Sequence, residues 1–177
     1  MKNSISNSRW FLNEIYLKGK YGYWDECASS HFNVDNCVDA LRARGIKKDE
    51  ELKSLVLCIG RRGEVNKYYI FHLLSSEELD NRLIENHFKY TRKEKINKIR
   101  LAEPEELKSA FSAIKGTITP LNKKIWNTYA FISPRLISGK IVSTNDGTVN
   151  GWIQFNSRVL LDSPNNNFKD NQIFDFS

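Results

Sequence analysis

The chain has 177 residues, of which 40% are hydrophobic and 12% aromatic, which excludes a disordered chain and suits one domain with a buried core. Its net charge of +6 is a moderate excess that would support docking to a polyanion but does not identify a nucleic-acid-binding protein. No apolar run approaches the roughly 20 residues of a membrane span, and Met1–Ser8 lacks the apolar core of a signal peptide. We therefore expect a cytoplasmic protein without a membrane partner.

The cysteines and histidines do not have the spacing of metal ligands. Cys58 lies in an apolar run and is expected to pack in the core. Cys27 or Cys37 would need a positioned base to act as a nucleophile, which we consider the weaker interpretation. The sequence predicts a site with no metal and no cofactor.

The N-terminal half begins with an arm, residues 1–30, that is rich in aromatic residues. It either packs across the core or shapes a pocket, and packing is the favoured role. The next segment, 33–45, predicts a helix with Asn33 or Asp35 as its cap and Gly45 as its C-terminal stop. Its expected apolar face consists of Cys37, Val38, Leu41 and Ile46.

Two apolar runs, 51–60 and 67–74, predict a β-hairpin around the turn at 61–64. Lys53 is unusual because it places a cation at the start of an apolar strand. It is either a strand-end lysine that reaches water or a ligand for phosphate or carboxylate on a rigid element.

A capping box between Ser75 and Glu78 predicts the next helix, with an apolar stripe at helical spacing: Leu79, Leu83, Ile84 and Phe88. The pattern repeats at 91–94, although 98–102 is read alternatively as a short strand. Positive charge gathers here, at Lys89, Arg92, Lys93, Lys95, Lys98 and Arg100. The cluster is either a solvated face or a patch for a polyanion such as RNA.

Another helix is predicted to begin at Glu103-Pro104 and to end at Lys115-Gly116. Its expected buried face consists of Leu107, Ala110, Phe111 and Ile114. Strands are then predicted at 125–132, 140–144 and 151–155, with a turn at 145–148 and a last short element at 158–161. The tail, 163–177, is polar and expected to be mobile, or else to dock through Ile173, Phe174 and Phe176.

The loop between the last helix and these strands has the pattern Gly-x-x-x-Pro, from Gly116 to Pro120. Gly116 accepts backbone angles closed to other residues, and Pro120 restricts Thr119 to extended conformations. A loop of this kind fixes the direction of several peptide groups, which suits the binding of a small polar group by backbone atoms.

Four stretches together resemble the YbaK/prolyl-tRNA-synthetase-associated domain family. In chain order they are 34–46, the lysine-bearing strand 52–57, the run 99–107 continuing into 115–120, and 142–147 followed by 151–155. The sequence departs from the family's pattern at 121–124, which lacks the usual Phe-Gly continuation, and in a turn at 145–150 that is poorer in glycine.

The resemblance implies a single α/β domain, residues 31–162, with a mixed curved β-sheet forming a partial barrel surrounded by helices. It implies hydrolysis of the ester of mischarged tRNA by a free-standing aminoacyl-tRNA deacylase. Lys53 matches the lysine that holds the terminal nucleotide, and Gly116 matches the catalytic loop. The implied substrate-binding residues are Thr117, Ile118, Thr119, Pro120 and Gly147, and the basic residues Lys89, Arg92, Lys93, Lys95 and Lys98 are expected to bind tRNA.

Two other functions remain open. The same fold can serve as a non-catalytic module that binds aminoacyl-tRNA, an amino acid or a protein, or the chain can be a general RNA-binding domain that uses residues 89–100. We rank the deacylase first. The expected partners are aminoacyl-tRNA and, as a further candidate, an aminoacyl-tRNA synthetase. DNA is not expected, since the ribose 2′-hydroxyl of RNA has a role in the chemistry.

Overall fold

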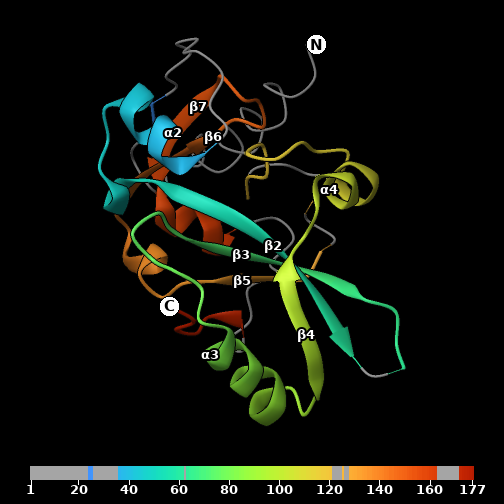
Figure 1. The fold of residues 1–177 in the computed structure, drawn as a ribbon. Helices are drawn as coiled ribbons and strands as arrows, with labels where there is room; N and C mark the ends of the chain where they lie inside the picture. The colour runs from blue at the N-terminus through green and yellow to red at the C-terminus, as the bar shows by residue number, and fades with distance from the viewer. Residues whose placement is uncertain (1–23, 26–35, 62, 121–124, 126–127, 163–171) are drawn as a thin grey trace.

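A four-stranded mixed sheet carries most of the core of the protein. The computed structural model describes residues 24–25, 36–61, 63–120, 125, 128–162 and 172–177. The strand order is β4-β2-β3-β5, in which β5 alone runs parallel to its neighbour, β3 (Figure 1). The strands are β2 (Leu52–Arg61), β3 (Lys67–Leu74), β4 (Ile96–Leu101) and β5 (Ala130–Ile132).

A second, three-stranded sheet has the order β1-β7-β6 and is antiparallel. Its strands are β1 (Trp24–Asp25), β6 (Ile141–Asn145) and β7 (Trp152–Asn156). The turn predicted at 145–148 joins β6 to β7, and its Gly147 has a φ of 96°, a conformation that favours glycine.

The two sheets pack through a shared apolar cluster, and among the described residues one backbone bridge joins them. Glu51, just before β2, forms an isolated parallel bridge with Ser143 of β6. Beyond that bridge the strands β2 and β6 diverge, and no barrel closure is found among the described residues. The predicted single α/β domain with a mixed sheet is therefore confirmed, whereas the partial barrel is not seen.

The helix before β2 is shorter than the sequence suggested. It is α2 (Cys37–Arg44), with Asn36 as its cap: the Asn36 side chain accepts a hydrogen bond from the Asp39 amide. The predicted caps Asn33 and Asp35 lie outside the described residues. Gly45 ends the helix with a φ of 66°, as predicted. The predicted apolar face is wrong at Val38, which is 58% exposed.

The helix predicted to begin at Ser75 begins instead at Asn81. Ser75 lies in a turn and its hydroxyl donates to Glu51, so it does not cap a helix. Asp80 is the cap of α3 (Asn81–Asn86), which continues as a π-helix over His87–Thr91. The second capping box, at 91–94, does not begin a helix. The alternative of a short strand at 98–102 is correct, since β4 covers most of that range.

The helix that follows begins where predicted and ends early. It is α4 (Pro104–Phe111), with Glu103 as its cap, and Ser112 ends it in the left-handed conformation at a φ of 51°. Leu107 and Phe111 are buried as expected, but Ala110 and Ile114 are exposed. Gly116 therefore lies in a loop beyond the helix rather than at its end.

Of the described residues in the strand predicted at 125–132, those of β5 are extended, and residues 121–124 and 126–127 lie outside the described part. The last predicted element, 158–161, is a 3-10 helix. The 3-10 helices cover Lys48–Glu50, Leu136–Ser138 and Ser157–Asp162. Of the helices in the described ranges, none is long and apolar enough to cross a membrane.

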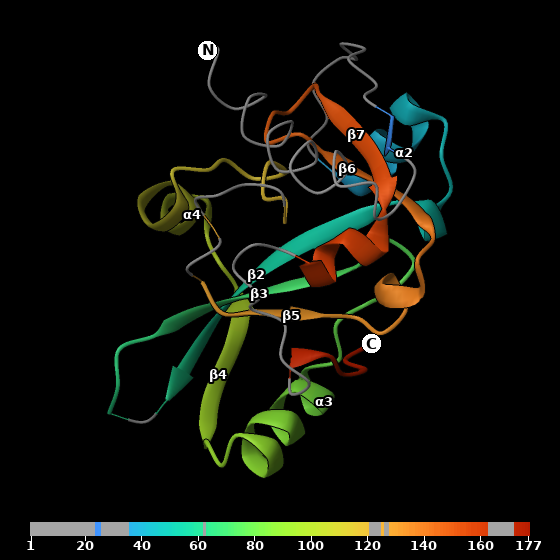
Figure 2. The same cartoon turned by 180° about the vertical axis from the view of Figure 1, so that it is seen from behind.

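The end of the tail docks on the core, between β5 and α3 (Figure 2). Phe176 is fully buried in the cluster that contains Phe71 and Phe131, and Ile173 forms a bridge with Ile132. The Phe174 ring stacks on the His87 ring with 3.8 Å between centroids. Docking, the second of the two expectations for this tail, is therefore correct for residues 172–177. Cys58 is also buried, as expected.

Candidate functional site

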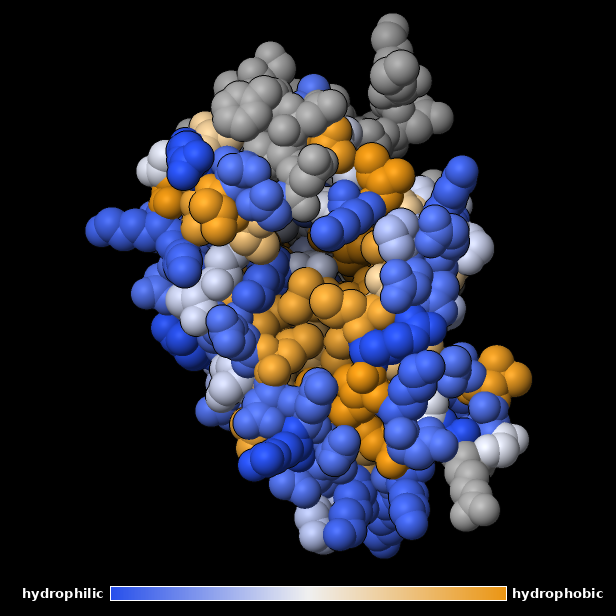
Figure 3. Space-filling model, viewed as in Figure 1, coloured by the Kyte–Doolittle hydropathy of each residue, from blue (hydrophilic) through white to orange (hydrophobic). Residues whose placement is uncertain are grey.

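A cavity of about 640 Å³ lies where β2 and β6 diverge. Its walls come from α2, the first half of β2, the start of α4 and the loop that contains Gly116. Figure 3 shows hydrophobic side chains gathered in a hollow on this face, with hydrophilic side chains around it. The volume is that of a site for a small molecule or for the end of a larger one.

Lys53 and Gly116 line this cavity together, although 62 residues lie between them in the sequence. The Lys53 ammonium donates to the Glu77 carbonyl at 2.5 Å and lies 3.4 Å from the Ser75 carbonyl. A lysine ammonium has three donors. Two carbonyl contacts therefore hold the cation in place and leave a proton for a ligand oxygen.

The loop from Gly116 to Pro120 presents some of its residues to the cavity. Gly116 is exposed, has a φ of 85° and lines the cavity together with Ile118. Thr117, Thr119 and Pro120 are buried and are not among the lining residues. The hydroxyl of Thr117 donates to the Ile114 carbonyl, so its side chain shapes the loop rather than the cavity wall.

Asn145 was missed in the sequence, and it connects two predicted elements. Its side-chain amide donates to the Ile118 carbonyl at 3.1 Å, and its side-chain oxygen accepts from the Gly147 amide at 2.9 Å. Asn145 lines the cavity, whereas Gly147 does not. Gly147 therefore does not touch the cavity itself, but its amide bonds the side chain of Asn145, which does. The only sequence signal was the turn-forming Asn-Asp-Gly run.

A buried ion pair lines the cavity at the point where the sheets meet. Arg44 Nη1 lies 2.9 Å from Glu51 Oε1, and the two side chains are 3% and 6% exposed. The other Glu51 oxygen accepts from the Ser75 hydroxyl. Desolvation raises the pKa of Glu51 and lowers that of Arg44. Nothing in the sequence signalled this pair, because it forms only when α2 packs beside β2.

Ser54 also lines the cavity, and its hydroxyl lies 2.8 Å from His72 Nδ1 on the neighbouring strand. Desolvation lowers the pKa of the buried His72 to about 3. An imidazole with this pKa accepts a proton poorly at neutral pH, so the pair is not a nucleophile with its base. We assign it a structural role.

The pKa of His72 predicts a pH dependence of stability. The folded pKa, about 3, is below the ordinary value of 6.5, so the unfolded chain binds more protons between these values. The stability contributed above pH 6.5 is therefore lost as the pH falls toward 3, by at most about 1.4 kcal/mol per pH unit. In urea unfolding at pH 7 and pH 4.5, His72→Asn should lose less stability than the wild type. Equal losses would contradict the assignment.

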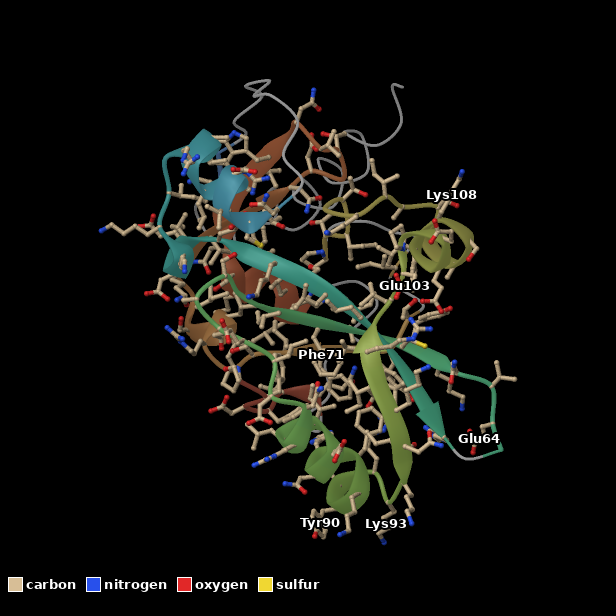
Figure 4. The ribbon with its side chains drawn as sticks, viewed as in Figure 1. Glu64, Phe71, Tyr90, Lys93, Glu103 and Lys108 are labelled. Atoms are coloured by element: carbon tan, nitrogen blue, oxygen red, sulfur yellow. The ribbon has the colours of Figure 1, made fainter. Side chains whose placement is uncertain are left out.

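The predicted tRNA-binding residues lie apart from the cavity. Lys89, Lys93, Lys95 and Lys98 are exposed, and none of them lines it. Figure 4 shows Lys93 and Glu103 at opposite ends of β4, and Glu103 is a lining residue. Arg92 differs from the lysines: its guanidinium lies 4.3 Å from the Tyr129 ring centroid and bonds Glu94. The Arg92 side chain therefore packs against Tyr129 and pairs with Glu94 within the protein.

Known proteins with a similar sequence or fold agree with the family resemblance of the sequence. The model of a family described as aminoacyl-tRNA editing domain matches residues 31–162. The chain belongs to the aminoacyl-tRNA editing domain family. This confirms the resemblance to the YbaK/prolyl-tRNA-synthetase-associated family. A search of curated proteins finds no match to this editing domain.

Solved structures share the fold of this editing domain at low sequence identity. A protein described as a candidate trans-editing enzyme for prolyl tRNA synthetase has a TM-score of 0.64 and 18% identity, over 100% of this chain and 98% of the other. A scaffold from an epitope-grafting design has 0.65 and 16%, over 100% and 99%. The hypothetical protein APE2540 has 0.61 and 19%, over 85% and 92%. At these identities the likeness shows the fold.

Proposed function

We propose that this editing domain is a trans-acting deacylase that hydrolyses the ester between a wrong amino acid and the 3′ end of a tRNA. The observation that carries the proposal is the cavity shared by Lys53 and Gly116. One supplies a fixed cation beside the cavity, and the other supplies a glycine backbone in a left-handed conformation.

The chemistry needs few groups because an aminoacyl ester is already activated. In the proposed arrangement the Lys53 ammonium binds a phosphate oxygen of the terminal nucleotide as a charge-assisted contact. The backbone N–H groups of the Gly116 loop stabilise the oxyanion that forms when water attacks the ester carbonyl. The neighbouring ribose hydroxyl orients that water. The alcohol that leaves is the ribose hydroxyl, and the acid that leaves is the free amino acid.

The bond from Asn145 to the Ile118 carbonyl supports the role of the loop. It fixes one peptide group two positions after Gly116, so the loop is held before a substrate arrives. A preorganised donor requires little rearrangement during reaction, which is the condition under which oxyanion stabilisation is most effective. Ile118, Thr117, Thr119 and Pro120 shape the loop, and Gly147 supports it through Asn145.

The exposed lysines 89, 93, 95 and 98 are the candidate contacts for the tRNA body, since they lie beyond the cavity along β4. A strand of six residues spans about 20 Å, which is within the reach of a tRNA acceptor arm that starts in the cavity. A synthetase is a second candidate partner because one structural relative is described as acting for prolyl tRNA synthetase.

A panel of charged tRNAs tests the proposal. The purified protein is incubated with tRNAs that carry labelled Ala, Ser, Cys, Thr or Pro, and the label that stays on tRNA is followed over time. At least one ester should be lost faster than in buffer. Loss of none would contradict the deacylase. Binding of a charged tRNA without loss would instead support a non-catalytic module on the same fold.

A further inference from the structure

The first half of β2 has an open edge that faces the cavity. β4 pairs with β2 only from Leu57 onward, and the lining residues of the cavity include every position from Glu51 to Val56. Consecutive side chains of a strand point to opposite faces, so an unbroken run of lining residues indicates that the cavity lies against the strand's edge.

The hydrogen bonds show which backbone groups lie on that edge. The Ser75 amide donates to the Glu51 carbonyl, so odd-numbered residues of this segment turn their peptide groups toward β3. The Ala102 amide donates to the Val56 carbonyl, so even-numbered residues turn theirs the other way. The C=O of Leu52, the N–H and C=O of Ser54 and the N–H of Val56 therefore point to the cavity, without a backbone partner among the described residues.

The open stretch is too short for a peptide strand. The Glu51–Ser143 bridge closes it at one end, and the bond from Ala102 to Val56 closes it at the other. What remains between these ends is a row of four groups: the C=O of Leu52, the N–H and C=O of Ser54 and the N–H of Val56. A peptide strand added to this edge would be blocked at both ends by the existing contacts. A planar ligand with one donor beside one acceptor needs only one C=O and a neighbouring N–H of this row.

We infer that this edge binds the adenine of the terminal adenosine, a base that all tRNAs share at the 3′ end. The inference rests on the proposed function for its substrate. Adenine presents an N6 amino donor beside the N1 acceptor on its Watson–Crick edge. The Ser54 carbonyl accepts from N6, and a flanking N–H, of Ser54 or Val56, donates to N1.

The surroundings of the edge fit the same ligand. Aliphatic side chains of the lining set, among them Leu55, Leu101 and Leu107, supply apolar surface for the faces of a base. Lys53 lies one residue before Ser54, so its ammonium stands within reach of the phosphate that the same nucleotide carries. The Gly116 loop across the cavity then faces the aminoacyl end. The strand and the loop bind opposite ends of one aminoacyl nucleotide.

Base analogues test the inference without altering the protein. The probes are hydrolysis-resistant alanyl amides of adenosine, 7-deazaadenosine and inosine monophosphates, and their affinities are measured by calorimetry with the full chain. Inosine reverses the donor–acceptor pair, and 7-deazaadenosine keeps it. The inosine amide should bind at least about tenfold more weakly than the adenosine amide, because two buried hydrogen bonds are replaced by mismatched pairs. The 7-deaza amide should match adenosine.

Equal affinity for the adenosine and inosine amides, or no binding of the adenosine amide, overturns the adenine site. Lys53→Ala serves as a control on the protein: it should weaken the adenosine and inosine amides by the same factor, since it removes the phosphate contact only. Hydrolysis in the tRNA panel without base discrimination would leave the deacylase standing and overturn this inference. Base discrimination without hydrolysis would support the adenine site and contradict the deacylase.

Discussion

Lys53→Ala is expected to lower kcat/KM for deacylation about a hundredfold, which corresponds to about 2.7 kcal/mol of transition-state stabilisation. The variant removes a cation that is held by the Glu77 and Ser75 carbonyls at the wall of the cavity. A charge-assisted contact to phosphate is lost with it, and the terminal nucleotide is then no longer fixed relative to the Gly116 loop. The measurement is single-turnover hydrolysis of the ester that the tRNA panel identifies.

Two controls separate this effect from a change in folding. Lys67→Ala removes another lysine from the same sheet: Lys67 is exposed at the start of β3 and does not line the cavity, so its loss should leave the rate unchanged. Lys53→Arg keeps the charge and should retain part of the activity, since its longer, planar head cannot take the same place between the carbonyls. Wild-type rates in a folded Lys53→Ala protein would show that the site has been misplaced.

Arg44→Met is expected to destabilise the protein by about 3–5 kcal/mol at pH 7, the cost typical of breaking a buried ion pair on one side. The Arg44 and Glu51 side chains are 3% and 6% exposed, so the variant leaves a carboxylate with little access to water. The bond from the Ser75 hydroxyl is then the main contact that the described residues give Glu51. The free energy of unfolding in urea measures the loss.

The double variant Arg44→Met/Glu51→Leu should recover most of that stability, because two apolar side chains of similar size need no partner. pH gives an independent check of the sign. Desolvation raises the pKa of Glu51 above its ordinary 4.5, so a stabilising contribution from its protonated form is present below pH 4.5 and lost as the pH rises through the folded value. The deficit of Arg44→Met relative to wild type should therefore be smaller at pH 4.5 than at pH 7. A double variant as unstable as the single one would contradict this account.

Local signals predicted the elements whose contacts are local. Gly45 ends α2 and Glu103-Pro104 begins α4, because caps and terminators act within one turn of a helix. The capping box at Ser75 was wrong because the Ser75 hydroxyl bonds Glu51, 24 positions earlier in the chain. A short polar motif cannot reveal that a distant carboxylate competes for its hydroxyl.

The candidate site divides in the same way. Lys53 and Gly116 were selected from the sequence, and the fold brings them to one cavity, while their roles remain predictions. Arg44, Glu51 and Asn145 were not selected, because each depends on a partner from another element. The basic stretch was treated as one unit, but the structure uses Arg92 for packing against Tyr129 and Arg100 for an ion pair with Glu106.

The docked segment 172–177 has a consequence for how the protein folds during synthesis. Phe174 and Phe176 contact rings from β3, β5 and the π-helix, so the aromatic core is completed by residues translated about a hundred positions after β3. A ribosome-bound chain that has not yet released this segment leaves the Phe71–Phe131 surface uncovered, and such apolar surfaces recruit chaperones or aggregate. The Ser177 hydroxyl also lies 3.3 Å from the carboxylate of Glu77, whose carbonyl holds Lys53. The docked segment therefore also contacts the residue whose carbonyl positions Lys53.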